Sequence, residues 1–210
     1  MELLLDHVFI LTRPGAPEAD LLLDLGLAEG EPNRHRGQGT ANRRFFFKGC
    51  MLELLYVHDV DELTAGPAAP LHLPDRLDRP GASRFGIVAR PVNPDASWDL
   101  PGWDYRPDYL TAGRRFLVGA NSDILEEPLL IVSPLGSPAG ESETGAFGAL
   151  TSVRIQVPVR RPSDALRAFF RCRNVSIVPG SAHLAEFEFG ESAAGRSADL
   201  RPALPLRMLW

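Results

Sequence analysis

The sequence predicts an α+β fold of two βαβββ modules with an inserted strand-and-loop segment between them. The first 58 residues carry apolar patterns in the order strand, helix, strand, strand, strand, and a similar order returns after residue 149. Nineteen glycines and nineteen prolines among 210 residues predict short elements separated by many turns. We therefore expect a first module over 1–58, the inserted segment over 59–148 and a second, degenerate module over 149–210, all in one compact unit.

The elements of the first module follow from its apolar runs and turn residues. Leu3–Leu11 is apolar, rich in branched side chains and closed by a Pro-Gly turn, which predicts a strand. The segment 17–25 has proline in its first turn, leucines at helical spacing and a glycine after its end, as short helices do. A weak strand and an exposed loop over 28–39 lead into strands at 40–48 and 50–58.

The middle segment is less regular. Residues 59–84 are rich in proline and lack periodicity, which predicts a loop, and the aromatic stretch 91–110 is also expected to be irregular. Short apolar runs predict strands at 85–90, 115–119 and 129–132. The stretch 133–148, rich in glycine, serine and proline, is expected to mark the boundary with the second module.

The last segment repeats the order of the first. Leu150–Val157 predicts a strand, and Pro162-Ser163-Asp164 predicts a helix start that is followed by apolar residues at i, i+3 and i+4. Further strands are expected at 175–178, 184–189 and 206–210. When the two opening strands are aligned, their apolar residues coincide and His7 falls opposite Ser152.

Composition limits the classes of partner. Acidic residues exceed basic ones by 27 to 22, and a net charge of −5 does not favour nucleic acid or an anionic membrane. The N-terminal apolar run lacks a basic flank, and no run approaches the roughly 20 residues of a membrane helix. Two distant cysteines, Cys50 and Cys172, are typical of a reducing compartment. We expect a cytoplasmic protein that binds a small molecule, with no nucleic-acid or membrane partner.

His7 and Glu53 are a candidate pair for metal binding. Strand alternation places His7 on the same face as Phe9, and Glu53 interrupts an otherwise apolar strand. Burying a lone carboxylate is costly, so Glu53 requires a partner. An imidazole with a carboxylate is half of a site for Zn²⁺, Mn²⁺, Fe²⁺ or Ni²⁺. Alternatively, His7 is a hydrogen-bonded core residue and Glu53 pairs with Arg43 or Arg44.

The chain resembles the vicinal oxygen chelate superfamily, in its glyoxalase/bleomycin-resistance/dioxygenase-like branch. The resemblance rests on the βαβββ order, an early LDHV strand and a fourth strand reading LELL. The segments HRGQGTANR (35–43), WDYRPDYL (103–110) and EPLL (127–130) are similar to those of an uncharacterised glyoxalase-like family. The resemblance spans essentially the whole chain and is specific for the family, but not for a reaction.

In that superfamily, metal ligands come from the first and fourth strands of each module, which implies His7 and Glu53 here. The second module departs from the pattern, because Ser152 stands at the place of one ligand. Its last strand offers only Arg207 or Met208, and Glu186 or Glu188 on the preceding strand takes part only if the strand register differs from our assignment. The resemblance therefore implies a divalent metal with an incomplete ligand set.

Other residues are candidates for substrate binding. The loop around Gln38 contains two glycines, which permit close approach of backbone amides to a polar group, although a flexible turn explains them equally. Asn42 and Arg43 begin the next strand, where Arg43 or Arg44 is expected to hold an anion, since alternation lets only one of the two face inward. Tyr105 and Tyr109 either line a pocket or cover the sheet.

Two functions follow from the resemblance. The first is a metal-dependent lyase, isomerase or dioxygenase that acts on a small oxygenated molecule, with the metal as Lewis acid. The second is a metal-free protein that binds or sequesters a small molecule, which the incomplete ligand set favours. Because dimers are common in the superfamily, a homodimer is also expected, and dimer assembly is a third role for the modules.

Overall fold

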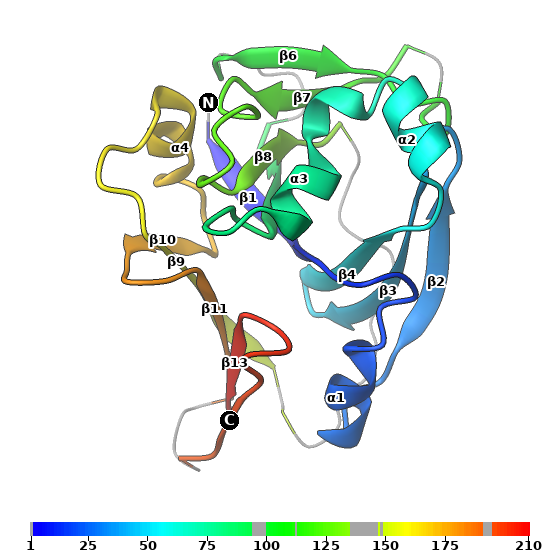
Figure 1. The fold of residues 1–210 in the computed structure, drawn as a ribbon. Helices are drawn as coiled ribbons and strands as arrows, with labels where there is room; N and C mark the ends of the chain where they lie inside the picture. The colour runs from blue at the N-terminus through cyan, green and yellow to red at the C-terminus, as the bar shows by residue number, and fades with distance from the viewer. Residues whose placement is uncertain (1, 94–99, 112, 135–146, 148, 191–194) are drawn as a thin grey trace.

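The computed structural model describes residues 2–93, 100–111, 113–134, 147, 149–190 and 195–210. It is a mixed α+β structure with two sheets and a few short helices (Figure 1), which confirms the predicted fold class. No helix among these residues has the length and apolar composition of a membrane-spanning segment. The predicted boundary at 133–148 lies largely outside the described residues.

The first module folds as a βαβββ unit. Its elements are β1 (Leu3–Leu11), α1 (Ala19–Asp24), β2 (Gly30–His35), β3 (Thr40–Phe47) and β4 (Cys50–Val57). Three of the four strands and the helix were predicted almost to the residue, and β2 lies within the stretch expected as weak strand and loop. The strand order is β2-β3-β4-β1, with β1 parallel to β4.

The middle segment contains more regular structure than its sequence predicts. Its elements are α2 (Val60–Ala65), the 3₁₀ helix η1 (Ala69–Leu71), α3 (Leu73–Asp78), β5 (Phe85–Pro91), β6 (Gly102–Tyr105), β7 (Phe116–Gly119) and β8 (Leu129–Val132). The prediction of loop over 59–84 was wrong for two short helices; the side chain of Asp59 caps α2 by accepting a hydrogen bond from the Glu62 amide. Each helix has only six residues, too few to produce a visible period.

The four strands of this segment repeat the pairing of the first module. Their order is β5-β8-β7-β6, with β5 parallel to β8, as β1 is parallel to β4. The two halves join where β1 and β5 run antiparallel with His7 opposite Val88, which makes one eight-stranded sheet. In Figure 1 this sheet curls from β2 on the right to β6 at the top, with α2 and α3 in front of it.

The last segment forms a five-stranded sheet. Its elements are β9 (Leu150–Val157), α4 (Asp164–Phe169), β10 (Ser176–Pro179), β11 (Leu184–Phe189), β12 (Ser197–Asp199) and β13 (Leu206–Leu209). Ser163 caps α4 as predicted. The strand order is β10-β9-β11-β13-β12, and the parallel partner of β9 is β10 and not the last strand. The pairing therefore differs from that of the first module, although the order of elements along the chain is similar.

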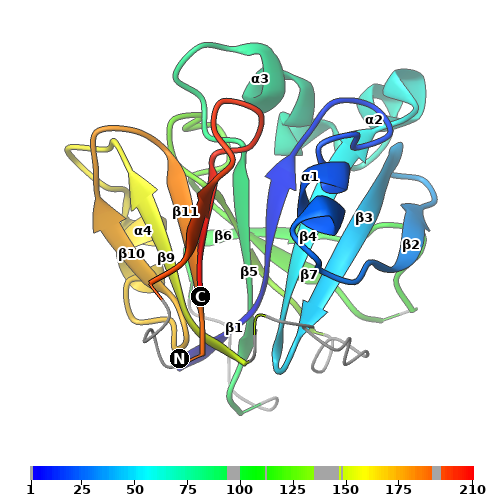
Figure 2. The same ribbon diagram turned by 90° about the horizontal axis from the view of Figure 1, so that it is seen from below.

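The main core lies between the two sheets, which face each other in Figure 2. The ring of Phe47 on β3 contacts those of Phe187 and Phe189 on β11, with centroids 6.0 and 5.1 Å apart. Helices α1 and α4 add apolar side chains to this core. A smaller apolar cluster occupies the opposite face of the eight-stranded sheet, under α2, η1 and α3. This second face is the one that carries the candidate site.

Candidate functional site

A pocket of about 420 Å³ opens on the face of the eight-stranded sheet that α2, η1 and α3 cover. Its lining includes His7 and Phe9 from β1, Glu53 and Leu55 from β4, and Asn42 from β3, so the predicted alternation of the strands is correct. This volume lies in the range of small-molecule sites.

His7 and Glu53 contact each other inside this pocket. His7 Nε2 lies 3.3 Å from Glu53 Oε2, and His7 Nδ1 lies 2.6 Å from Asp6 Oδ1. The other oxygen of Glu53 accepts a hydrogen bond of 2.5 Å from Asn42 Nδ2. The partner that a buried Glu53 requires is therefore a histidine and an amide, and neither Arg43 nor Arg44 supplies it.

The opposite charges of His7 and of its carboxylate neighbours stabilise each other's ionised forms. Burial alone lowers the pKa of His7, but its hydrogen bonds to Asp6 and Glu53 and their negative charges outweigh burial and raise the pKa to about 9. Burial raises the pKa of Glu53, whereas the hydrogen bond and charge of His7, followed by His35 and Asn42, lower it to about 2. Both shifts favour an imidazolium paired with a carboxylate at neutral pH.

The donor set does not fit the divalent metal that the resemblance implies. A metal takes the lone pair of a neutral imidazole, whereas both nitrogens of His7 face carboxylate oxygens, which raise its pKa and favour the protonated ring. The corresponding strands of the second half line the pocket with Val88, Leu129 and Ile131, which have no donor atoms. Among the described residues no group of three or more His, Cys, Asp or Glu side chains is placed to hold a metal ion.

Glu186, the third predicted metal residue, is not in the pocket. It lies on β11 in the five-stranded sheet, where its carboxylate accepts hydrogen bonds from Gln156 and Arg207. Its neighbour across the strands is Arg154 on β9. These contacts give Glu186 a structural role in a polar sheet face.

Gln38 connects the two halves of the sheet at the pocket. Its Oε1 accepts hydrogen bonds from the hydroxyls of Tyr105 at 2.7 Å and Tyr109 at 3.1 Å, and its Nε2 donates to Thr40 Oγ1 at 2.7 Å. Gln38 and the two tyrosines, all predicted to bind substrate, line the pocket together with Asn42. Their roles in binding stay predictions. The segments 35–43 and 103–110, which contain these residues, meet at the side chain of Gln38.

The glycines beside Gln38 allow the loop to pack against α2. Gly39 has a positive φ, and a Cβ there would lie 2.2 Å from the carbonyl oxygen of Asp59. The backbone amide of Gly37 donates to Glu62 Oε1, and that of Gln38 donates to the His35 carbonyl. The loop amides are therefore used within the fold, and it is the side chain of Gln38 that reaches the pocket.

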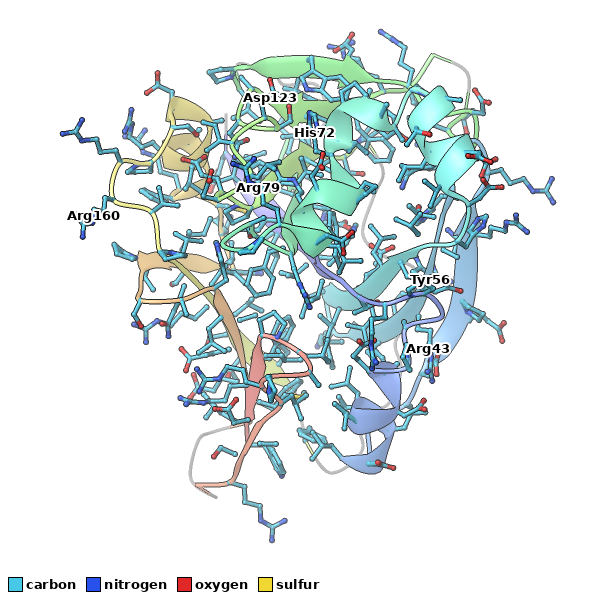
Figure 3. All side chains as sticks on the ribbon, viewed as in Figure 1. Arg43, Tyr56, His72, Arg79, Asp123 and Arg160 are labelled. Carbon is cyan, nitrogen blue, oxygen red and sulfur yellow. The ribbon has the colours of Figure 1, made fainter. Side chains whose placement is uncertain are left out.

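Of the two neighbouring arginines, Arg44 faces the pocket and Arg43 does not. Figure 3 shows Arg43 beside α1, where it donates to Glu29 through two nitrogens and to Asp20 at 2.8 Å. Arg43 is therefore an ion-paired residue on the opposite face, and its prediction as a substrate-binding residue is not supported by its position. The alternation rule left the choice open, and the register of β3 decides it.

Sequence reasoning missed four polar residues of the pocket lining, namely Asp6, Asn33, His35 and Ser133, and it left Arg44 as one of two alternatives. His35 ends β2, and its Nδ1 lies 2.9 Å from Thr40 Oγ1 across the β2–β3 hairpin. The spacing of His35 to Thr40 around a two-glycine turn was a usable signal, because such a turn pairs the residues on either side of it.

No family model matches this sequence, and no curated protein matches it. Among solved structures, a hypothetical protein from Staphylococcus aureus has a TM-score of 0.57 at 13% identity, covering 99% of both chains. This likeness shows a shared fold. A methylmalonyl-CoA epimerase from Mycobacterium tuberculosis has a TM-score of 0.40 at 18% identity over 65% of this chain and 88% of the enzyme. A hypothetical protein from Bacillus halodurans reaches 0.43 at 13% identity, over 68% and 99%.

Proposed function

We propose that this protein binds a small amphipathic molecule in the pocket of its eight-stranded sheet, without a metal ion. The observation that carries the proposal is the division of the pocket wall. The first half of the sheet supplies His7, Glu53 and Asn42, whereas the second half supplies Val88 and Ile131. A ligand that fills both sides needs a polar end and an apolar body.

The apolar side is extensive enough to hold a ring or a short chain. In addition to the residues of β5 and β8, it includes Leu71 and Leu73 from the helical cover and Phe116 from β7. Burial of apolar ligand surface stabilises a complex by roughly 25 cal/mol per Å² before the cost of association. The polar side supplies the hydrogen bonds that orient the ligand. This arrangement supports binding or sequestration, in the manner of a vicinal oxygen chelate protein that lacks the metal.

The proposal sets aside the metal-dependent enzyme that the sequence led us to expect, because the donors of His7 and Glu53 are already occupied. Metal content measured by mass spectrometry checks this choice. Protein purified without chelators is expected to hold no metal at near-stoichiometric level, and His7→Ala and Glu53→Gln are expected to leave the content unchanged. Glu186→Gln is the matched control outside the pocket. Stoichiometric metal that both pocket variants lose contradicts the proposal.

Binding itself is tested with the fluorescent probe 1-anilinonaphthalene-8-sulfonate, which has an apolar body and one polar group. We expect saturable binding that a chelator does not change. Ile131→Trp fills the pocket and is expected to weaken binding at least about tenfold, since a clash in a packed site costs at least about 1.4 kcal/mol. Val92→Trp, at an exposed position after β5, is the control.

If Ile131→Trp does not fold, Val88→Phe adds less volume at the paired position of β5. Equal probe binding by wild type and folded pocket-filling variants would mean that the probe binds elsewhere, and the proposal would fall.

The homodimer and the cytoplasmic location stay predictions. Light scattering on the purified protein checks the homodimer.

A further inference from the structure

Among the described residues that line the pocket, Arg44 is a cation whose charge no carboxylate pairs with. Arg44 lies directly across from Glu53 in the β3–β4 pairing, yet Glu53 is bound by His7 and Asn42 instead. The guanidinium is held by a hydrogen bond of 2.7 Å from its Nε to the Glu31 carbonyl and by the ring of Phe46, 5.1 Å from its centre. Within the part of the chain that the structure describes, Arg44 forms no ion pair.

The other charged groups of the polar wall pair with one another or with Arg90, which lies outside the lining. The carboxylates of Asp6 and Glu53 stand on either side of the His7 imidazolium, and Arg90 Nε lies 3.7 Å from the second oxygen of Asp6. Two negative groups thus face two positive groups. Arg44 adds one further positive charge at the wall. Its hydrogen bond to the Glu31 carbonyl uses Nε, and its contact with Phe46 uses the face of the guanidinium, so both contacts orient the terminal amino groups.

His35 adds a neutral hydrogen-bond donor to the same wall. Because Gln38 Oε1 accepts from both tyrosines, its Nε2 is the atom that donates to Thr40 Oγ1. We assign the proton of the buried Thr40 hydroxyl to His35 Nδ1, 2.9 Å away, because the hydroxyl oxygen already accepts from Gln38 Nε2. A neutral imidazole that accepts at Nδ1 carries its proton on Nε2. His35 lines the pocket, and its Nε2 lies 3.9 Å from Glu53 Oε1, beyond hydrogen-bond distance.

We propose that Arg44 and His35 select ligands whose polar end is an oxyanion such as a carboxylate, with the Arg44 guanidinium as the charged partner and His35 Nε2–H as a second donor. This inference rests on the proposed function, because it specifies the polar end of the molecule that the pocket binds. A guanidinium binds a planar carboxylate through two parallel N–H···O hydrogen bonds. Apolar residues of β5 and β8 line the same pocket and would contact the body of such a ligand.

The test compares three probes that share one body and differ in charge. Calorimetric titrations use 2-naphthoate, the neutral 2-naphthamide and the cationic 2-naphthylmethylammonium. We expect wild type to bind the naphthoate at least about tenfold more tightly than the amide, and the cation more weakly than the amide, because a charge-assisted hydrogen bond exceeds a neutral one by about that factor.

Arg44→Gln is expected to reduce the preference for naphthoate to within about threefold while the amide binds as before. Arg43→Gln removes an identical charge from the neighbouring residue on the other face and is expected to keep the full preference. If Arg44→Gln does not fold, the relative affinities of wild type for the three probes test anion selection on their own.

The outcomes separate the two proposals. If the amide and the naphthoate bind with equal affinity, or if Arg44→Gln keeps the preference, anion selection is overturned while small-molecule binding stands. If none of the probes binds and the pocket-filling variants behave as wild type, both proposals are overturned. A preference lost in Arg44→Gln and kept in Arg43→Gln supports both.

Discussion

In the first half of the eight-stranded sheet, the strands that face the pocket carry His7 and Glu53; in the second half, β5 and β8 carry Val88 and Ile131. Both halves use the same order, with the first strand parallel to the fourth, and they meet where His7 is paired with Val88. The backbone arrangement is thus repeated and the side-chain chemistry is not. Under the proposed function, the charged side chains that orient the ligand come from the first half, and β5 and β8 add apolar surface to that of Phe9 and Leu55.

The largest effect is expected from making the first half resemble the second. His7→Leu removes the imidazolium between Asp6 and Glu53 and leaves two buried carboxylates facing each other. We expect a loss of about 3–5 kcal/mol in the free energy of unfolding, measured with urea, because an unpaired buried charge is costly. Val88→Leu, at the paired position of β5, is the control and is expected to change stability by about 1 kcal/mol or less.

A further change sharpens this comparison. In the double variant His7→Leu/Glu53→Leu most of the lost stability is expected to return, since replacing both members of a buried pair by apolar residues is often neutral. If the double variant is no more stable than His7→Leu, the cost is due to packing or to the remaining Asp6 carboxylate, and not to the unpaired charge of Glu53.

The pH dependence of stability is the second effect in size. The pKa of His7 is raised to about 9, so its stabilising contribution is complete below its unfolded value of 6.5 and is lost as pH rises toward 9. The pKa of Glu53 is lowered to about 2, so its contribution is present above 4.5 and is lost as pH falls toward 2. We expect urea unfolding to show a loss on the order of 2–3 kcal/mol between pH 6.5 and 9.

The loss expected between about pH 6.5 and 9 is due to His7, which lies in the first half of the sheet. The double variant His7→Leu/Glu53→Leu is therefore expected to have a flat profile between about pH 6.5 and 8.5, whereas Val88→Leu keeps the slope of wild type. A wild-type profile without a decline over this range would show that His7 is not held as an imidazolium.

The smallest of the three effects concerns the contact between the halves. Gln38→Leu deprives the hydroxyls of Tyr105 and Tyr109 of their acceptor, and the loss is expected to be about 1–3 kcal/mol, because a buried donor is left unpaired. Gln156→Leu, whose amide donates to Glu186 on the other sheet, is expected to cost less than about 1 kcal/mol. Similar losses in both variants would mean that Gln38 does not couple the halves specifically.

Much of the fold could be predicted because its signals are local. The apolar runs of Leu3–Leu11, Leu150–Val157 and Leu184–Phe189 predicted strands with bounds equal to those observed, since a buried strand needs only a run of apolar residues between turns. The cap of α4 at Ser163 is a signal of the same kind. The short elements α2, α3 and β6 were missed because each is too short to show a complete hydrophobic period.

Alone, the sequence determined which residues are polar within or beside apolar strands, and this pattern was sufficient to make His7, Glu53, Gln38 and Asn42 candidates. Only the tertiary structure decided that β5–β8 complete the first sheet, that Arg44 and not Arg43 faces the pocket, and that Glu186 belongs to another sheet. Strand pairing joins residues distant in the chain, and a shift of one residue in register exchanges the two faces. Neither the partner of a strand nor its register is encoded in a local pattern, whereas burial and alternation are.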